Sequence, residues 1–519
     1  MAERGGVRTV DVLVVGGGIM GAGVARVAAH AGLSVLLVER ADFASGTSSR
    51  SSKLVHGGLH YLARGQVGTA RRACAERNAL LEAGSGLVHG LAFAIPRDQT
   101  GPYPPWAVGL LMRAYGWWGG VDPCDVPDPR ADEARPDAAP FRYRDAVTDD
   151  AALVLRVLRE ARGAGATCLN GVEARHLVRS SDGLVAGMRL HDRAAGRAWV
   201  QPARVVVNAA GVGADRVRAG LGLDAVLTHV RGSHLVLPRH RLPLRHAVAT
   251  IDPHTARPVY AVPWLGVTLV GSTSEPQPEA LDREPRITRA EADHLLAWAR
   301  GLAPARCLGP DDVLCTFSGV RGLCAGPAAA GLHGSRDHRV LEERGLFTVA
   351  GGKLTTFAHV ARDVLGRIWP RLRPGRVHPA PAPTLDAVPP PWMGLPFASG
   401  TARRLLGRHG AEGVEWMAAR PRDEHHAVVS HVCVAEVRWI IRAEAPRSLS
   451  DLLLRRTRLA LCTADGGTAA AAALRPWIQE EMGWGTARWK EELHAHRQRM
   501  AEAYGWPHGA GRETGRSVA

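Results

Sequence analysis

The chain has 519 residues, of which 46% are hydrophobic and 22% charged, and this predicts a soluble protein of two or three domains. Its net charge of +15 is compatible with an anionic membrane surface, an anionic substrate, nucleic acid or no special partner. No basic run is interleaved with stacking aromatic residues, so we do not expect nucleic-acid binding. The eight cysteines form no C-x-x-C pair and no histidine cluster completes a zinc pattern, so we expect neither a metal site nor a disulfide framework.

The sequence also predicts a cytoplasmic location. No run of 18 apolar residues indicates a membrane-spanning helix, and the first apolar run is a glycine-ended strand rather than a signal peptide. Unpaired, scattered cysteines are typical of a reducing compartment.

A dinucleotide-binding unit opens the chain. Residues 10–15 form a continuously apolar, β-branched run that is typical of a buried parallel strand. Residues 16–21 follow as G-x-G-x-x-G and open a helix, which allows a tight turn, close approach of a pyrophosphate and close helix–strand packing. A second strand at 34–38 ends in Glu39, whose carboxylate suits a ribose diol. This unit predicts a dinucleotide but does not distinguish nicotinamide from flavin.

A polar stretch follows the second strand within a few residues. Residues 47–61, TSSRSSKLVHGGLHY, are rich in hydroxyls and glycines and also carry a lysine, two histidines and a tyrosine. A lone nicotinamide domain usually continues with further strand–helix units, so this stretch favours a larger, covered cofactor. We expect its backbone to wrap around the cofactor while its longer side chains reach a substrate.

Later segments supply the remaining walls of this site. A helix is expected from Asp149, with its acids at the N-terminus, and it leads to a strand at 166–170. Another buried strand ends in small residues at 204–211. The short strands between 227 and 317 predict an antiparallel substrate domain, and a last strand at 347–350 precedes the helix-opening segment GGKLTT.

Two helices are expected near the beginning of the chain. Residues 71–82 alternate charged and apolar positions and predict an amphipathic helix. Residues 106–118, WAVGLLMRAYGWW, form a short stretch rich in aromatic residues, with arginines at positions 97 and 113. Their pattern suits either a helix that dips into a membrane interface or a buried core helix.

The C-terminal part reads as a separate unit. Eight prolines at 374–396 predict a stiff, extended linker, and 397–504 has helical spacing, as at 428–442. The arginines at 455, 456 and 458 are expected to face water, and 505–519 is expected to be a disordered tail.

Four segments, in this order, carry a specific resemblance: DVLVVGGGIMGAGVA from residue 11, TSSRSSKLVHGGLHYL from 47, FSGVRGLC from 317 and GGKLTTF from 351. Together they resemble the FAD-dependent glycerol-3-phosphate dehydrogenases, within the D-amino-acid-oxidase-like flavoproteins, over about residues 10–496. The resemblance implies an α/β fold with a discontinuous Rossmann-like FAD-binding domain, an antiparallel-sheet substrate domain and an all-helical C-terminal domain. The expected boundaries are about 8–100, 150–220 and 320–373 for the FAD-binding domain, and about 101–149 and 221–319 for the inserted substrate domain.

The glycine motif and the resemblance together imply the residues that bind FAD. They are Gly16, Gly18, Ile19, Gly21, Glu39, Arg40, Thr47, Ser48, Ser49, Ser51, Ser52, Lys53, Leu54, His56, Gly57, Gly58, Val172, Ala209, Ala210, Gly211, Gly352, Lys353, Leu354 and Thr355. His56 also makes a covalent linkage to FAD conceivable.

The activity that the resemblance implies is oxidation of sn-glycerol 3-phosphate to dihydroxyacetone phosphate, with the hydride passing to flavin N5 and the electrons to a quinone or to oxygen. It also implies glycerol metabolism at the inner face of the cell membrane as a peripheral protein, and it is compatible with a homodimer. The implied catalytic residues are His234, Arg321, Lys353 and His56. The implied substrate-binding residues are His60, Tyr61, Arg321, Arg336, Lys353 and Ser272. A histidine among cations tends to be neutral, as a base must be, and both His234 and His56 qualify.

Two positions depart from the family pattern. His60 stands where the family has a phosphate-contacting arginine in G-G-L-R-Y-L, and Ser274 stands where the family has an acid in G-T-T-D. Two other hypotheses are therefore kept. One is a flavin oxidase of the same fold that acts on an amine or another hydroxy acid, and the other is a basic binding or scaffold protein with a vestigial nucleotide unit.

Overall fold

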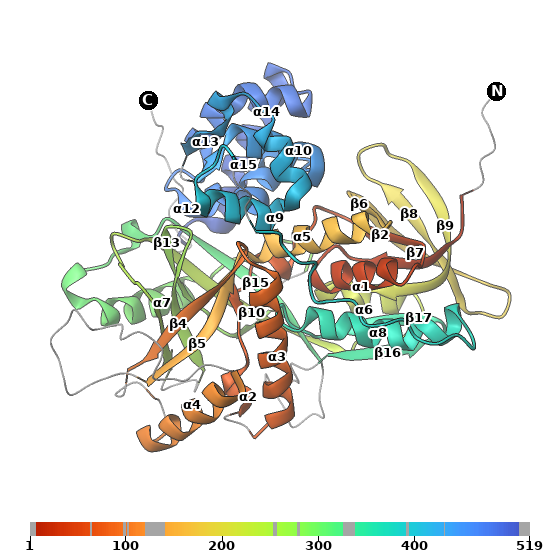
Figure 1. Ribbon diagram of the computed structural model, residues 1–519, viewed down its shortest axis with the longest axis horizontal. Helices are drawn as coiled ribbons and strands as arrows, with labels where there is room; N and C mark the ends of the chain where they lie inside the picture. The colour runs from red at the N-terminus through yellow and green to blue at the C-terminus, as the bar shows by residue number, and fades with distance from the viewer. Residues whose placement is uncertain are drawn as a thin grey trace.

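The computed structural model has two sheet-containing parts that lie side by side and a helical part that lies across both (Figure 1). The residues that it describes are 7–62, 65–96, 100, 103–119, 141–252, 257–277, 281–324, 338–390, 394–429 and 431–507. None of the helices within these ranges has both the length and the apolarity that crossing a bilayer needs.

The first sheet carries the predicted dinucleotide-binding unit, with its strands in the order β16-β17-β9-β1-β2-β6. β1 pairs in parallel with both β2 and β9, and β17 pairs in parallel with β9. The α/β, Rossmann-like fold expected from the sequence is therefore confirmed. The strands are β1 (Val10–Val15), β2 (Val35–Glu39), β6 (Thr167–Asn170), β9 (Ala198–Asn208), β16 (Arg339–Glu343) and β17 (Leu346–Ala350).

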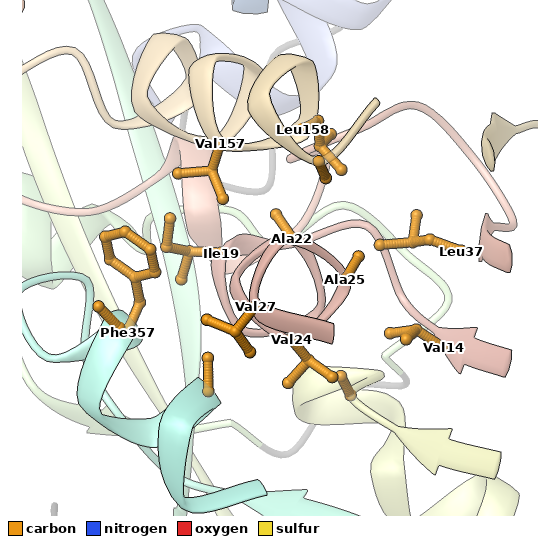
Figure 2. Packing of buried hydrophobic residues seen from close by; sticks show 14 of the residues in the cluster. Val14, Ile19, Ala22, Val24, Ala25, Val27, Leu37, Val157, Leu158 and Phe357 are labelled. Carbon is orange, nitrogen blue, oxygen red and sulfur yellow. The ribbon is translucent and has the colours of Figure 1, made fainter. Parts of the chain in front are cut away.

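The two faces of this sheet are covered differently because successive residues of β1 point to opposite sides. Val12 and Val14 pack in one hydrophobic cluster with residues of three helices. Figure 2 shows α1 at the centre of this cluster, with α5 and α8 on either side. Leu13 and Val15 pack against an antiparallel pair of strands that continues from the first half of β9. The helices are α1 (Ile19–His30), α5 (Asp150–Gly163) and α8 (Phe357–Leu372), and the strands are β7 (Val172–Arg179) and β8 (Val185–Asp192).

The second sheet is mostly antiparallel, as the short strands of the substrate domain predicted, and its order is β14-β10-β13-β12-β11-β4-β5-β3, with β15 paired to β10. Its strands are β3 (Leu54–Val55), β4 (Val88–Ile95), β5 (Phe141–Thr148), β10 (Leu227–Pro238), β11 (Ala247–Ile251), β12 (Pro258–Trp264), β13 (Val267–Gly271), β14 (Glu275–Pro276) and β15 (Cys315–Cys324). The helices beside it are α2 (Leu59–Leu62), α3 (Val67–Ala83), α4 (Pro105–Gly119) and α7 (Arg289–Leu302). The helices expected near 71–82 and 106–118 are thus present as α3 and α4.

Two expected domain boundaries differ from the division of the strands between the two sheets. We placed residues up to about 100 in the FAD-binding domain, but β3 and β4 belong to the second sheet, where both pair with β5. β15 also lies in the second sheet, although we began the last FAD-binding segment at about 320. An alternating or apolar run indicates a strand but does not name its partner, and these partners lie far away in the chain.

Within its described residues, the C-terminal part is helical except for one pair of short strands. Where we expected a helix to start at Val428, the structure has β18 (Ala427–Val429) and β19 (Val432–Cys433), and the helix begins only at Val434. The all-helical expectation is therefore wrong at this one place, where β-branched valines favour a short antiparallel pair. The helices are α9 (Ser399–Ala418), α10 (Val434–Glu444), α11 (Leu449–Asp451), α12 (Leu459–Cys462), α13 (Thr468–Ala473), α14 (Arg475–Met482) and α15 (Thr486–Arg499).

The expectation that Arg455, Arg456 and Arg458 face water is also wrong. Each of these side chains is at most 3% exposed, and each forms an ion pair with an acid of the sheet-containing parts. Charged residues rarely lie inside a protein unless they are paired, and these pairs are what permits their burial.

The proline-rich segment is fastened along the first domain rather than free. Arg26 donates to the carbonyl of Pro383 at 2.6 Å and pairs with Asp386 at the same distance. Arg156 donates to the Asp386 carbonyl at 2.7 Å, and Leu385 is buried. The first residues of the expected tail also make contacts: Thr316 donates to the Gly505 carbonyl at 3.1 Å, whereas residues from 508 lie outside the described ranges.

Candidate functional site

The glycine turn after β1 lies where the first sheet changes direction. β2 is on one side of β1 and β9 is on the other, and ligands of such sheets bind in the crevice at this switch point. A Cβ atom on Gly16, whose φ is +111°, would lie 2.5 Å from the Ala209 carbonyl oxygen. A Cβ atom on Gly21 would lie 1.9 Å from the carbonyl oxygen of Gly16. Both glycines are therefore required by close backbone contacts.

The groups around this turn fit the adenosine and pyrophosphate end of a dinucleotide. Gly18, the N-cap residue of α1, has no side chain that could cap the helix, and the first-turn N–H groups other than that of Ile19, which donates to Ser48, can receive a phosphate. The Glu39 carboxylate accepts hydrogen bonds from the N–H groups of Gly17 at 2.8 Å and Ala41 at 2.9 Å, which hold it beside the turn. Burial raises the pKa of Glu39 in spite of these bonds. A ribose diol would give this carboxylate two further donors.

The loop after β9 contacts the glycine turn, and the segment between β6 and β7 follows the neighbouring strands of the same sheet. Ala209 follows β9 directly, and the Gly211 backbone has φ +57° with open space where a Cβ would be. Val172 is the buried first residue of β7, which follows β6. Arg40 is different, because its guanidinium pairs with Asp282 at 3.2 Å on the exposed surface.

Residues 47–53 form the bridge between the two sheets, and we call them the cradle. The Ser48 hydroxyl accepts from the N–H of Ile19 at 3.0 Å, which joins the cradle to α1. On its other side the cradle contacts β15, because a Cβ on Gly319 would lie 2.6 Å from the Arg50 carbonyl oxygen. The cradle then runs into Leu54 and the second sheet. It therefore lies between both domains, where a cofactor shared by them would be held.

The Lys53 side chain does not reach toward a substrate. Its Nζ atom donates to the Ser49 carbonyl at 2.6 Å and pairs with Asp150 at 2.9 Å, and the side chain is fully buried. Burial lowers its pKa to about 8 even though Asp150 favours the charged form. The same carboxylate accepts from both the N–H and the hydroxyl of Ser51, at 3.0 and 2.7 Å. Lys53 thus supports the cradle from the side of α5.

His234 lies on the substrate side of the cradle. Its Nε2 atom is 2.8 Å from the Ser52 hydroxyl, and its ring stacks on Phe317 with centroids 4.6 Å apart. Its Nδ1 atom is buried and has no hydrogen-bond partner among the described residues. Burial, with the positive charges of Arg321 and Lys53, lowers the pKa of His234 well below its ordinary value. This imidazole is neutral at physiological pH.

Arg321 lies on β15 and Ser272 directly follows β13, and these two strands flank His234. β10 pairs with β15 on one side and β13 on the other, and this register sets His234 opposite Phe317 and Gly271. Arg321 Nη2 donates to the Ser272 hydroxyl at 2.8 Å. Its guanidinium lies over Gly232, where a Cβ would come within 2.4 Å of Nη2. The sheet therefore brings a cation, a hydroxyl and a neutral histidine together.

Lys353 approaches from the first domain. It follows Gly352, whose φ is +88° and whose missing Cβ leaves room for Met20 at the start of α1. The Lys353 ammonium lies 3.4 Å from the centre of the Tyr61 ring, and burial lowers its pKa to about 7. Leu354 and the buried Thr355 continue this turn into α8.

The segment from His56 to Gly58 depends on residues that sequence reasoning missed. Half-buried His56 directly follows β3, and the N–H of Gly57 donates to Asp145 at 2.9 Å. Asp145 also accepts from Arg77 and from the Tyr115 hydroxyl, both at 2.7 Å. No motif marks these three residues, because they meet only through the pairing of β4 with β5 and the packing of α3 and α4. Arg336 and the His60 side chain lie outside the described residues.

Comparison with known proteins agrees with this geometry. Residues 11–364 match the family of FAD-dependent oxidoreductases, and residues 376–489 match the C-terminal domain of α-glycerophosphate oxidase. Glycerol-3-phosphate dehydrogenase 1 of Mycobacterium tuberculosis is 33% identical over 89% of this chain and 94% of its own. Glycerol-3-phosphate dehydrogenase of Synechocystis is 30% identical over 95% and 96%.

Two solved structures share the fold. The glycerol-3-phosphate dehydrogenase of Bacillus halodurans, complexed with FAD, has a TM-score of 0.74 at 24% identity and covers 96% of this chain and 95% of its own. The L-α-glycerophosphate oxidase of Mycoplasma pneumoniae, with FAD bound, has a TM-score of 0.55 at 19% identity and covers 74% and 100%.

Gly21→Ala should abolish most dinucleotide binding, because the new Cβ would push α1 away from the carbonyl of Gly16. We expect the flavin content of the purified protein to fall about tenfold or more, as read from visible absorbance per protein. Gly163→Ala is the matched control, since a Cβ there has no neighbour within 4 Å. Wild-type flavin content in Gly21→Ala would contradict the placement of the cofactor at this turn.

Proposed function

The chain belongs to the family of FAD-dependent oxidoreductases, with FAD as its cofactor, and we propose that it oxidises sn-glycerol 3-phosphate to dihydroxyacetone phosphate. The relatives named above support this substrate through their names, and they match nearly the whole chain. The observation that carries the proposal is the neutral, buried His234 beside the cation of Arg321.

His234 is our choice for the base that takes the hydroxyl proton at C2 of the substrate. When Nε2–H donates to the Ser52 hydroxyl, Nδ1 keeps its lone pair, and it has no other partner among the described residues. Bound FAD supplies the hydride acceptor at N5. His56, which follows the cradle and β3, is the second candidate.

Arg321 and Lys353 would bind the phosphate and the developing oxygen charge. Arg321 offers a planar guanidinium fixed by Ser272, and such a group suits bidentate phosphate binding. Lys353 reaches the same side from the first domain, next to Tyr61. We assign Arg336 and His60 to phosphate binding on the family pattern alone.

We further propose a quinone as electron acceptor and a peripheral place on the inner face of the cell membrane. The support is α4, on which Trp106, Leu110 and Trp117 are 75%, 66% and 81% exposed. With the exposed Arg113 they form a stripe at helical spacing, while Met112 and Tyr115 are buried on the other face. Aromatic residues with a nearby arginine suit the headgroup region of a bilayer.

Anaerobic sn-glycerol 3-phosphate should bleach the bound flavin, whereas glycerol without phosphate should not, because it lacks the group that the cations bind. His234→Gln should slow the bleaching by about 10²- to 10⁴-fold, as loss of a general base does.

Faster recovery of the colour with a soluble quinone than with oxygen would support the quinone as electron acceptor. Bleaching by an amine or another hydroxy acid, but not by sn-glycerol 3-phosphate, would establish the alternative oxidase.

Substrate binding should weaken as pH rises through about 7, where the Lys353 ammonium of the free protein loses its proton and its charge. The substrate phosphate, with a second pKa of about 6, is mostly a dianion in this range, so the protein supplies most of the change. We expect kcat/KM to fall about tenfold between about pH 6.5 and 8.5. Lys353→Arg should flatten this profile. If His60→Arg flattens it instead, His60 is the titrating cation, and an unchanged slope in both variants would refute this source of the pH dependence.

Replacing Trp106 and Trp117 together by serine should reduce binding to vesicles that contain anionic lipid, because the exposed stripe on α4 would lose its aromatic anchors. Co-sedimentation should fall about tenfold or more. Val377→Ser is the control, since Val377 is 91% exposed but lies outside α4. Equal binding of the double variant and the wild type would exclude α4 as the membrane contact.

A further inference from the structure

A cluster of four buried charges joins the cradle to the C-terminal part. Lys53 and Asp150 are fully buried, Arg458 is 1% exposed and Asp149 is 9% exposed. Arg458 Nε donates to Asp149 at 2.8 Å, and Nη2 contacts Asp150. Two cations thus neutralise two carboxylates, and only Arg458 comes from the C-terminal part.

Arg458 acts on the cradle through Asp150. This carboxylate accepts the N–H and hydroxyl of Ser51 and pairs with Lys53, so its position sets the backbone on both sides of Ser52. Arg458 Nη1 also lies 3.4 Å from the Ser49 carbonyl, which already accepts from Lys53. Three of the seven cradle residues, Ser49, Ser51 and Lys53, are therefore held either by Arg458 itself or by Asp150, which Arg458 contacts.

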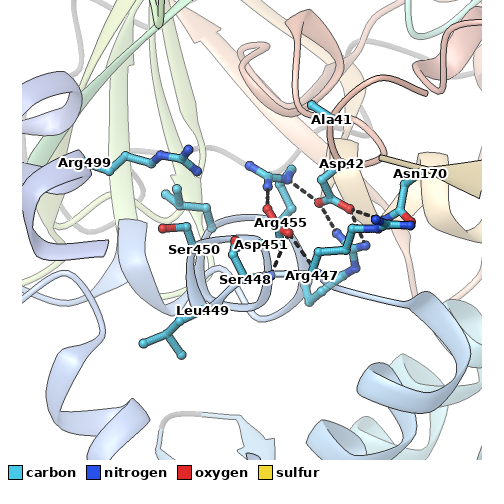
Figure 3. A network of polar contacts seen from close by, with 12 residues as sticks. Ala41, Asp42, Asn170, Arg447, Ser448, Leu449, Ser450, Asp451, Arg455 and Arg499 are labelled. Atoms are coloured by element: carbon cyan, nitrogen blue, oxygen red, sulfur yellow. Dashed lines mark hydrogen bonds and ion pairs between the residues drawn. The ribbon is translucent and has the colours of Figure 1, made fainter. Parts of the chain in front are cut away.

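Arg455 and Arg456, which end a π-helix (Leu452–Arg456) just before Arg458, make a second contact, with the loop after Glu39. Asp42 lies three residues after Glu39, and its carboxylate accepts from Arg455 Nε at 2.6 Å and from Arg456 at 2.6 and 2.8 Å. Figure 3 shows Arg455 between Asp42 and Asp451, with Asn170 on the other side of Asp42. These arginines hold the pKa of Asp42 well below its ordinary value, although burial opposes them.

We propose that the turn at residues 455–458 is a positioning element of the FAD site. Arg458 fixes the cradle through Asp150, and Arg455 with Arg456 fixes the loop after Glu39 through Asp42. The C-terminal part thereby completes the cofactor site without supplying a group that touches the cofactor. This inference rests on the proposal that the cradle holds FAD, but it does not depend on the identity of the substrate.

The charge balance makes Arg458 the sensitive position. Without its guanidinium, Asp150 keeps only Lys53 as an ion-pair partner and Asp149 keeps only the charge of the nearby Arg408, and a buried carboxylate without a full partner is strongly unfavourable. Asp150 would then move toward water or take up a proton, and Ser51 would lose its acceptor. A lysine at 458 restores the charge but not the forked geometry that spans both carboxylates.

The test is titration of apoprotein with FAD in four proteins: wild type, Arg458→Met, Arg458→Lys and Arg438→Met. Arg438 is the matched control, because it pairs with Glu424 and Glu481 inside the C-terminal part and contacts no cradle residue. Fluorescence quenching measures the dissociation constant, the visible spectrum of the bound flavin reports its surroundings, and the melting temperature of the apoprotein reports stability alone.

We expect Arg458→Met to weaken FAD binding about tenfold or more and to shift the flavin spectrum, with partial recovery in Arg458→Lys. Arg438→Met should lower the melting temperature with FAD affinity unchanged. If Arg458→Met does not fold, Arg458→Lys carries the test, with weakened FAD binding at near wild-type melting temperature as the expected result. Wild-type affinity and spectrum in the Arg458 variants that fold, with only their apoprotein melting temperature reduced, would overturn the inference.

Discussion

Buried carboxylates must be neutralised, and this constraint governs how the parts of the molecule meet. Asp42, Asp145, Asp150 and Glu160 are each at most 7% exposed, and each pairs with an arginine or lysine. Many of these cations come from distant parts of the chain, as Arg26 does for Glu160 and Arg456 for Asp42. Removing one partner of such a pair is far more damaging than never having had the pair, so these contacts fix the relative positions of the elements that carry them.

The same contacts give part of the positive charge a structural use. A net charge of +15 first suggests an anionic partner. Several of the arginines, however, form ion pairs inside the molecule. Among them are those at 26, 77, 156, 456 and 458, which are almost fully buried. The charge that remains available to lipid or phosphate must therefore be sought at specific places, such as Arg113 on α4 or Arg321 on β15, rather than in the total.

Local patterns predicted the glycine turn and the FAD-binding fold because the contacts that require them are local. The turn at Gly16 to Gly21 needs glycine for contacts within one β-α unit, and its motif therefore identified both the fold and the crevice. The approach of His234, Arg321 and Ser272 required the register of three strands, and only a family resemblance could anticipate it. Arg458 and Asp145 left no signal, since a charged residue usually faces water and the partners that permit the burial of these two lie far away in the chain. We missed that β3 and β4 belong to the second sheet, because the sequence of a strand does not identify the strand with which it pairs.

The separation of Asp150 from Arg458 has a consequence for synthesis. The two residues are 308 positions apart, and the arginine lies near the end of the chain. As domains of a nascent chain form from the N-terminus onward, the glycine turn and the cradle emerge from the ribosome long before their last buried charge is compensated. Until Arg458 has been synthesised, the buried carboxylates of Asp149 and Asp150 lack one of their cations. A truncated product that ends before residue 458 would lack this cation permanently. Synthesis of the segment that carries Arg458 is therefore coupled to maturation of the region that we propose to hold FAD.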